Sequence, residues 1–359
     1  MEPVTQALLG AATAELVAGH RLGRRALGWG AVVGMLPDLD VLLAPLNGGY
    51  GEWLYHRGTT HSLWFGFVMG PLLGWILWRW RDRERETPLW AWVALAVVAL
   101  VTHPILDGFT PYGTQFFAPF SRARFAWNGV AIVDPFYTIP LALGVFVAAS
   151  SRFRLDFGRV ALGLSLATTT AYLLAGLGLN RMVLEDLGDV LAAEGHSVIR
   201  VRAYPTIFQP WLRSFVARTP DGTIVGLHSL TDPGCPSWKM HPRPDPRPET
   251  QAVLDSWQGE LLEWFADGDI GVFAAPTASG TQVRVEDLRY SWSNRDARGM
   301  WGITANVVDG RRIDGEITRF DRPPLAPGDL DRFADLLLGK LPGREEGWFR
   351  PSNCARPTR

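Results

Sequence analysis

Long apolar runs constrain this chain more than any other feature of its sequence. A helix that crosses the hydrocarbon core of a bilayer needs about 20 mostly apolar residues. We expect six such helices, near residues 3–19, 26–46, 62–79, 88–106, 131–149 and 160–179. The first run is short and contains Glu15, so it could dip into the bilayer instead of crossing it. The sequence therefore predicts an α-helical multi-pass membrane domain over residues 1–180.

The arginines of this half predict its orientation. Most of them lie in three links, at residues 21–25, 79–86 and 151–159. With six spans these links share one side, which the positive-inside rule assigns to the cytoplasm. Both termini and the other links then face outward. The start, "MEPVTQALLG", is acidic where a cleavable signal peptide is basic, so we expect the first apolar run to be retained.

The second half is polar and proline-rich, and it predicts an α+β extramembrane domain on the outer side, over residues 184–345, followed by a tail at 346–359. Strand patterns occur in "HSVIRVRAYP", "TIVGLHSL", "TQVRVEDLRYSW" and "WGITANVVDG". We expect one amphipathic helix over 249–268, another over 328–341 capped by an Asp, and an exposed loop over 235–249. Two cysteines are too few for a disulfide framework, although one bridge between Cys235 and Cys354 stays open.

Polar residues that do not suit lipid gather on the predicted outward side. A charged group at bilayer depth costs about 2.5–3.5 kcal/mol, so such residues pair, line a wet cavity or bind an ion. Imidazoles and carboxylates are the usual ligands of zinc and related divalent ions. The i, i+4 spacing in "HPILD" places its His and Asp on one helix face. We therefore predict a divalent metal, zinc or else manganese, held by Asp38, Asp40, His56, His61, His103 and Asp107.

Several roles stay open from the residues alone. Asp38 and Asp40 would face apart on a regular helix, and an unwound turn would bring them together. Asp134, which precedes a proline, suits a general base or a helix cap. The guanidinium of Arg57 could hold an anionic substrate group or anchor the chain at the interface. Tyr112, Thr114 and Tyr137 could shape the pocket or simply pack.

The same residues carry a family resemblance. Over about residues 1–150 the chain resembles the membrane-bound metal-dependent hydrolases of the YdjM type, bacterial inner-membrane proteins, through "MEPVTQALLGAA", "GMLPDLDVL", "HRGTTHSL", "THPILDGFTPYGTQFFAPFS" and "IVDPFYTIPL". The family often has Thr-His where this chain has Thr5–Gln6, so a His ligand at position 6 is absent. The resemblance implies a hydrolase. A more distant similarity to zinc-dependent phospholipase C implies a phosphoester or lipid-like substrate.

The preferred interpretation is a metal-dependent hydrolase at the outer membrane face, with Asp40 or Asp134 as general base. The same side chains could instead line a transport route, or could only pin helices together in a scaffold. No internal repeat is evident, which weighs against transport. The net charge of −1 argues against nucleic acid as the main partner, and the apolar spans predict membrane lipids as partners. The sequence predicts no particular oligomeric state.

Overall fold

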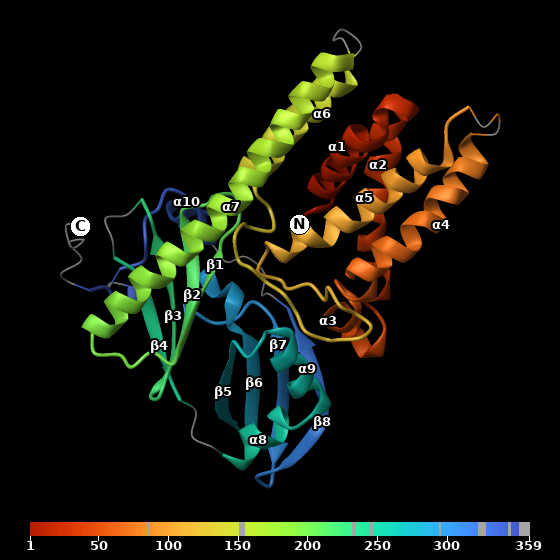
Figure 1. Ribbon diagram of the computed structural model, residues 1–359. Coiled ribbons are helices and arrows are strands. Elements are labelled where there is room, and N and C mark those ends of the chain that lie inside the picture. Colours follow the sequence, from red (N-terminus) through yellow and green to blue (C-terminus); the bar gives the residue numbers. More distant parts are fainter. Residues whose placement is uncertain are drawn as a thin grey trace. The chain divides into compact units, whose positions relative to one another are not determined.

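The chain divides into two compact units, Met1–Gly178 and Leu179–Arg359, which are described separately. The computed structural model describes residues 1–82, 84, 86–150, 155–231, 235–243, 247–293, 296–321, 328–343 and 346–351. The first unit is helical and the second is rich in strands (Figure 1). A multi-pass helical region followed by a domain with two antiparallel sheets is therefore the architecture of this protein.

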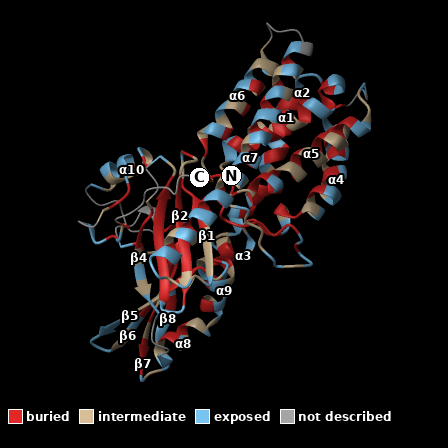
Figure 2. Ribbon diagram, turned by 60° about the vertical axis from the view of Figure 1, so that its left-hand side comes forward, coloured by how far each residue is buried: buried red, intermediate tan, exposed pale blue. Residues whose placement is uncertain are grey.

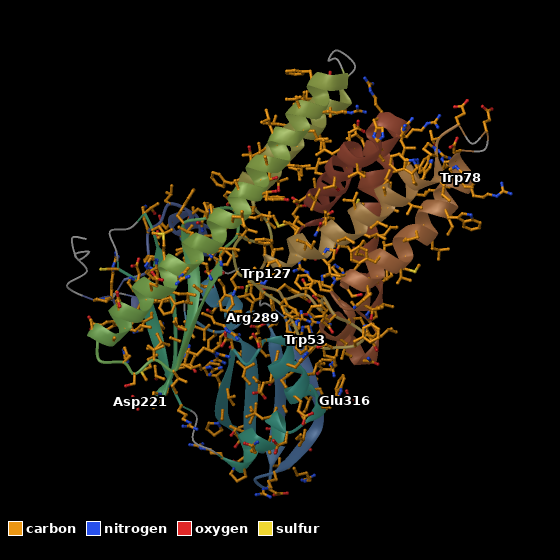
Figure 3. The ribbon with its side chains drawn as sticks, viewed as in Figure 1. Trp53, Trp78, Trp127, Asp221, Arg289 and Glu316 are labelled. Atoms are coloured by element: carbon orange, nitrogen blue, oxygen red, sulfur yellow. The ribbon has the colours of Figure 1, made fainter. Side chains whose placement is uncertain are left out.

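Six long helices form the framework of the first unit: α1 (Pro3–Leu22), α2 (Arg25–Met35), α4 (Leu63–Arg81), α5 (Leu89–Gly108), α6 (Pro135–Ala149) and α7 (Leu155–Ala193), whose second part belongs to the other unit. Short elements connect α2 to α4: η1 (Leu36–Leu43), η2 (Asn47–Gly49), α3 (Gly51–Tyr55) and η3 (Thr59–His61). Figure 3 shows Trp53 of α3 and Trp78 of α4 at opposite ends of the helices. The short elements therefore gather at one end of the unit.

Small residues bring the helices of the first unit unusually close together. A Cβ atom placed on Gly10 of α1 would lie 2.3 Å from the Gly30 carbonyl oxygen of α2. Along α4, Gly66, Gly70 and Gly74 recur every four residues and face valines of α5. Hydrocarbon tails offer helices no hydrophobic gain on association, so close backbone packing of this kind is what holds membrane helices together.

The structure contains fewer clear spans than the six predicted. Among the described residues, three helices are long and apolar enough to cross a bilayer: Arg25–Leu43, Leu89–Gly108 and Phe157–Ala193. A fourth span is possible if Gly51–His61 and Leu63–Arg81, bent by 61°, act as one. Helix α6 has 15 residues, which is about 22 Å of helix against a core of about 30 Å. Helix α1 buries polar side chains, including Glu15. A count of six spans is therefore not confirmed.

Two four-stranded antiparallel sheets form the second unit. One sheet contains β1 (Arg200–Pro205), β2 (Leu212–Thr219), β3 (Gly222–Ser229) and β4 (Ser237–Pro242), in that order. The other contains β5 (Ile270–Thr277), β6 (Gly280–Asp287), β7 (Gly302–Val308) and β8 (Arg312–Phe320), with η4 (Leu288–Ser293) after β6. Strand β3 is buried along its whole length, because Val183, Leu187 and Leu191 of α7 pack in the same core as its Ile224 (Figure 2).

Three local predictions for the second unit were wrong. The predicted loop 235–249 contains strand β4, which pairs with β3. The predicted helix 249–268 is two helices, α8 (Pro248–Leu254) and α9 (Trp257–Phe265), because the Ser256 hydroxyl accepts the Gly259 N–H and starts a new helix. Helix α10 (Asp329–Leu337) begins after Gly328 and has no side-chain cap.

Cys235 is disulfide-bonded, so it is not a free thiol. The sequence left a single bridge between the two cysteines as an open alternative. Cys354, the other cysteine of the chain, lies outside the described residues.

Replacing Gly70 with alanine tests the packing of α4 on α5. The added Cβ would lie 2.5 Å from Val97 Cγ2 and 2.8 Å from Val97 Cα, so the helices must separate. We expect the free energy of unfolding to fall by about 1–3 kcal/mol, measured by denaturant titration in detergent micelles. Gly28→Ala in α2 is the control, because no atom lies within 4 Å of its Cβ position and alanine favours the helix. Equal effects of the two substitutions would contradict this packing.

Candidate metal centre

Four side chains from three parts of the first unit meet where α2 and α5 end and α4 begins. Asp38 lies in η1, His61 ends η3, and His103 and Asp107 lie one turn apart near the end of α5. One ligand atom of each residue lies within 4.8 Å of the others. His61, His103 and Asp107 are at most 1% exposed. We refer to these four residues as the metal cluster.

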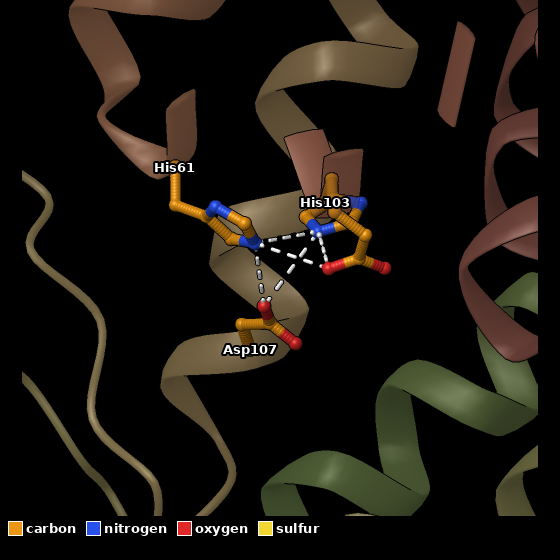
Figure 4. Close-up of side chains that lie close together, drawn as sticks. His61, His103 and Asp107 are labelled. Carbon is orange, nitrogen blue, oxygen red and sulfur yellow. Dashed lines mark hydrogen bonds and ion pairs between the residues drawn. The ribbon is translucent and has the colours of Figure 1, made fainter. Parts of the chain in front are cut away.

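Hydrogen bonds fix which nitrogen of each imidazole faces the cluster. His103 Nδ1 lies 2.6 Å from the Gly34 carbonyl oxygen, which can only accept, so Nδ1 carries the proton. His61 Nδ1 lies 3.1 Å from Asp40 Oδ2 and donates to that carboxylate for the same reason. In the neutral form, which is the form that binds a metal, each imidazole has one N–H, so both Nε2 atoms then present lone pairs to the cluster. They lie 3.0 Å apart (Figure 4).

The two carboxylates of the cluster point at the same place. Asp38 Oδ1 lies 3.3 Å from His61 Nε2 and 3.4 Å from His103 Nε2. Asp107 Oδ2 lies 3.3 Å and 3.6 Å from the same two nitrogens. Two imidazole lone pairs and two carboxylate oxygens at these distances repel one another unless a positive charge lies between them, which a proton on one imidazole or a metal ion can supply. A divalent metal fits this set of two nitrogen and two oxygen donors, which is a zinc-type set.

Asp40 and His56 lie behind the cluster, not in it. Asp40 accepts hydrogen bonds from His56 Nδ1 at 2.7 Å, from the Thr60 hydroxyl at 2.7 Å and from the Arg57 N–H at 3.1 Å, besides its contact with His61. Its oxygens are thereby occupied. Asp40 is placed to orient the His61 ring, as the second layer of a metal site does.

The 3₁₀ conformation of η1 explains how both aspartates reach one histidine. Asp38 contacts Nε2 of His61 while Asp40 contacts Nδ1 of the same ring. A regular α-helix would turn two residues at i, i+2 well apart. The sequence left open an unwound turn at this place; the structure instead has a more tightly wound 3₁₀ turn, which begins at Leu36 and has Pro37 in its first turn.

Arg57 is buried and is bound to Asp107. Its Nε lies 3.2 Å from Asp107 Oδ2, and its Nη1 donates to the Thr110 hydroxyl at 2.6 Å. The guanidinium also lies over the Tyr112 ring, 4.8 Å from its centroid. Gln6 Nε2 donates to Asp107 Oδ1 at 2.9 Å, and the Met1 amino group contacts the same oxygen. These partners hold the Asp107 carboxylate in one orientation.

Asp134 lies at the start of α6 and is not one of the clustered residues. It caps this helix by accepting the Phe136 N–H at 3.0 Å, and its other oxygen accepts the Tyr172 hydroxyl at 2.8 Å. Of the two roles left open for Asp134, the structure shows the helix cap. Tyr137 packs in the hydrophobic core. The Thr114 backbone pairs with Phe125.

Sequence reasoning missed three groups that support the cluster: Gln6, Thr60 and the carbonyl of Gly34. Gln6 carried a usable signal, because a polar residue in an apolar helix needs a partner. Its Oε1 atom is buried and has no hydrogen-bond partner in the described part of the chain. Nothing in the sequence could reveal that Gly34 offers its carbonyl oxygen, since that depends on how α2 packs.

Comparison with known proteins identifies a family match for the first unit. The profile of the family described as "YdjM inner membrane protein" matches residues 1–178, which is the first unit with its cluster. Inner membrane protein YbcI of Escherichia coli is 36% identical over 127 residues, which cover 33% of this chain and 70% of YbcI. The chain belongs to the YdjM family of inner membrane proteins. It is therefore an inner-membrane protein.

A second relative extends beyond the first unit. Uncharacterized protein YfhP of Bacillus subtilis is 28% identical over 207 residues, which cover 54% of this chain and 58% of YfhP. No solved structure matches the chain.

Removing one imidazole tests the metal cluster. We expect the purified wild type to hold about one divalent ion per chain, and His61→Ala to lose it, because one of the four donors, and one of the two nitrogens, is then missing. Asp40→Asn should bind about 10–100-fold more weakly, since it only loosens the ring orientation. Elemental analysis and a competition titration measure both. His20→Ala, at the other end of α1, should match the wild type. A metal-free wild type after loading with zinc or manganese would contradict the site.

Proposed function

We propose that this protein is a membrane-embedded metal-dependent hydrolase that acts at the outer membrane face. The observation that carries this proposal is the convergence within 4.8 Å of donor atoms from the buried residues His61, His103 and Asp107 and from the half-buried Asp38. We infer zinc as the ion, with manganese as the alternative, because two imidazoles with two carboxylates suit both. When bound, such an ion polarises a phosphoryl or acyl oxygen and lowers the pKa of a bound water.

The surrounding residues keep the donors in position. The Gly34 carbonyl and Asp40 hold the two imidazoles through their Nδ1 atoms. Arg57 and Gln6 hold Asp107 from two sides. Since the side chain of Arg57 is 3% exposed and engaged with Asp107, its contribution is to set the charge and direction of this carboxylate. Substrate anchoring by Arg57 would require it to leave that partner.

We assign proton transfer to the His56–Asp40 pair. Asp40 already accepts four hydrogen bonds, so it is poorly placed to take a proton from water directly. His56 donates through Nδ1 to Asp40 and is 20% exposed in its side chain, which leaves Nε2 as an acceptor. An imidazole oriented by a carboxylate is the usual general base of hydrolases.

We infer a lipid-like or phosphoester substrate. Element η1, which supplies Asp38, carries exposed apolar side chains: Leu39 is 55% exposed and Leu42 is 73% exposed. Apolar side chains exposed beside a polar site favour a substrate with an acyl or prenyl part. This surface lies at the end of a candidate span, where such molecules have their headgroups.

We place the second unit on the outer side of the membrane. Arg24 and Arg25, before and at the start of α2, and Arg79 and Arg81, at the end of α4, lie at the opposite end of these helices from the cluster, which supports an outward-facing cluster under the positive-inside rule. The disulfide of Cys235 supports the same side for the second unit, because disulfides persist in oxidising compartments and are rare in the cytosol.

Turnover of phospholipids and phosphoesters by the metal-loaded protein tests the proposed activity. We expect His103→Ala to lose activity by at least about 10³-fold, since it removes a metal ligand, and His56→Gln by about 10²–10⁴-fold through loss of the base. His56→Gln should still bind the ion, because His56 is not in the cluster. Full activity of His103→Ala, or metal-dependent ion uptake without any hydrolysis, would refute the hydrolase.

Reporter fusions test the orientation. An enzyme reporter that is active only outside the inner membrane, fused after residue 351, should be active. The same reporter inserted after residue 82, in the link between α4 and α5, should be inactive. The reverse pattern would place the metal cluster on the cytoplasmic face.

A further inference from the structure

A polar pocket lies at the end of the first unit opposite the metal cluster, where α2 begins and α4 ends. Its volume is about 410 Å³. Its lining residues are Arg25, Trp80, Arg81, Asp82, Glu84 and Glu86. Arg25 and Arg81 are the terminal residues of two candidate spans, so the pocket lies at the depth of the lipid headgroups.

Two guanidinium groups form the cationic part of this pocket. The Arg81 guanidinium lies against two indole rings, 5.2 Å from the centroid of Trp29 and 4.8 Å from that of Trp80. These two contacts limit the directions open to the side chain, and its N–H groups can still bind a ligand. Arg25 is exposed at the first residue of α2. A phosphate group suits two guanidinium groups at this position.

Three carboxylates line the pocket, and two of them are available to a ligand. Asp82 is not available, because it accepts the Glu86 and Thr87 N–H groups and the Thr87 hydroxyl. Glu84 and Glu86 are exposed and make no ion pair with another described residue. Within the described part of the chain, the lining therefore offers two guanidinium groups and two carboxylates that form no ion pair, and together they match a ligand that carries both charges.

An apolar stripe on α4 leads directly to the pocket. Val68, Leu72, Ile76 and Trp80 follow one another at i, i+4 and are 42–65% exposed. They share one helix face, which runs for about 18 Å, close to the thickness of one leaflet. An acyl chain can pack along this stripe, whereas a ligand without an apolar part cannot.

We propose that this pocket and stripe bind one zwitterionic phospholipid of the phosphoethanolamine type. Its phosphate binds Arg25 and Arg81, its ammonium group binds Glu84 and Glu86, and an acyl chain lies along Val68, Leu72 and Ile76. This site is separate from the metal cluster and does not depend on hydrolase activity.

Native mass spectrometry of the full chain, titrated in detergent with phosphatidylethanolamine, tests the site. We expect the double variant Arg25→Gln/Arg81→Gln to bind about tenfold or more weakly, because it loses two charge-assisted contacts. The matched control is Arg24→Gln/Arg79→Gln, which removes two exposed arginines that do not line the pocket. Its affinity should stay within about twofold of the wild type. Equal losses in both double variants would reduce the site to general interfacial charge and overturn the proposal.

Two competition experiments on the wild type identify the ligand. Phosphatidylethanolamine should displace phosphatidylglycerol with the same acyl chains, and Glu84→Gln/Glu86→Gln should abolish this preference. Equal binding of the two lipids by the wild type would overturn the zwitterionic assignment. Glycerophosphoethanolamine and inorganic phosphate, which lack acyl chains, should not displace the lipid at millimolar concentration. Displacement by either would show a site for a soluble phosphate compound instead.

Discussion

The approach of two imidazole nitrogens to 3.0 Å is the constraint on which the first unit depends. Because His61 and His103 each donate through Nδ1 to an oxygen, their Nε2 lone pairs in the neutral form face each other beside two carboxylates. Such an arrangement needs compensating positive charge in a buried environment. Arg57 and the Met1 amino group supply part of that charge at Asp107. His61, His103 and Asp107 are at most 1% exposed, and a divalent ion held between the four side chains would supply the rest.

Helix packing sets the direction of one of the two rings. Gly34, whose carbonyl oxygen accepts from His103, packs against Gly10 and the Gln6 carbonyl of α1 at distances that exclude a side chain. A residue larger than glycine at this contact would push α2 away from α1 and move the carbonyl oxygen. Fold stability and ligand orientation therefore share the same backbone contact. This coupling explains why small residues lie so near the cluster.

The sequence predicted which residues gather at the site better than it predicted which of them are donors and which lie behind the donors. Charged residues in apolar segments identified His61, His103 and Asp107, because lipid penalises an unpaired charge whatever the fold. The separation of Asp40 and His56 into a second layer depends on a 3₁₀ turn after Pro37, and spacing alone could not reveal it. In the second unit, the alternating apolar and polar residues of β3 and β6 predicted strands. Strand β4 was not predicted, because its proline-rich sequence is typical of a loop and only pairing with β3 makes it a strand.

The contacts between neighbouring helices help to decide between a hydrolase and a transporter. A permeation route needs polar groups and space along the helices between the two membrane faces. Instead, α4 and α5 meet at Gly66, Gly70 and Gly74, where a Cβ would lie 2.5–2.7 Å from its nearest neighbour. The contact between α1 and α2 is equally tight at Gly10 and Gly30. Donor atoms that converge at one end of such tightly packed helices suit a reaction at a membrane surface better than a route across the membrane.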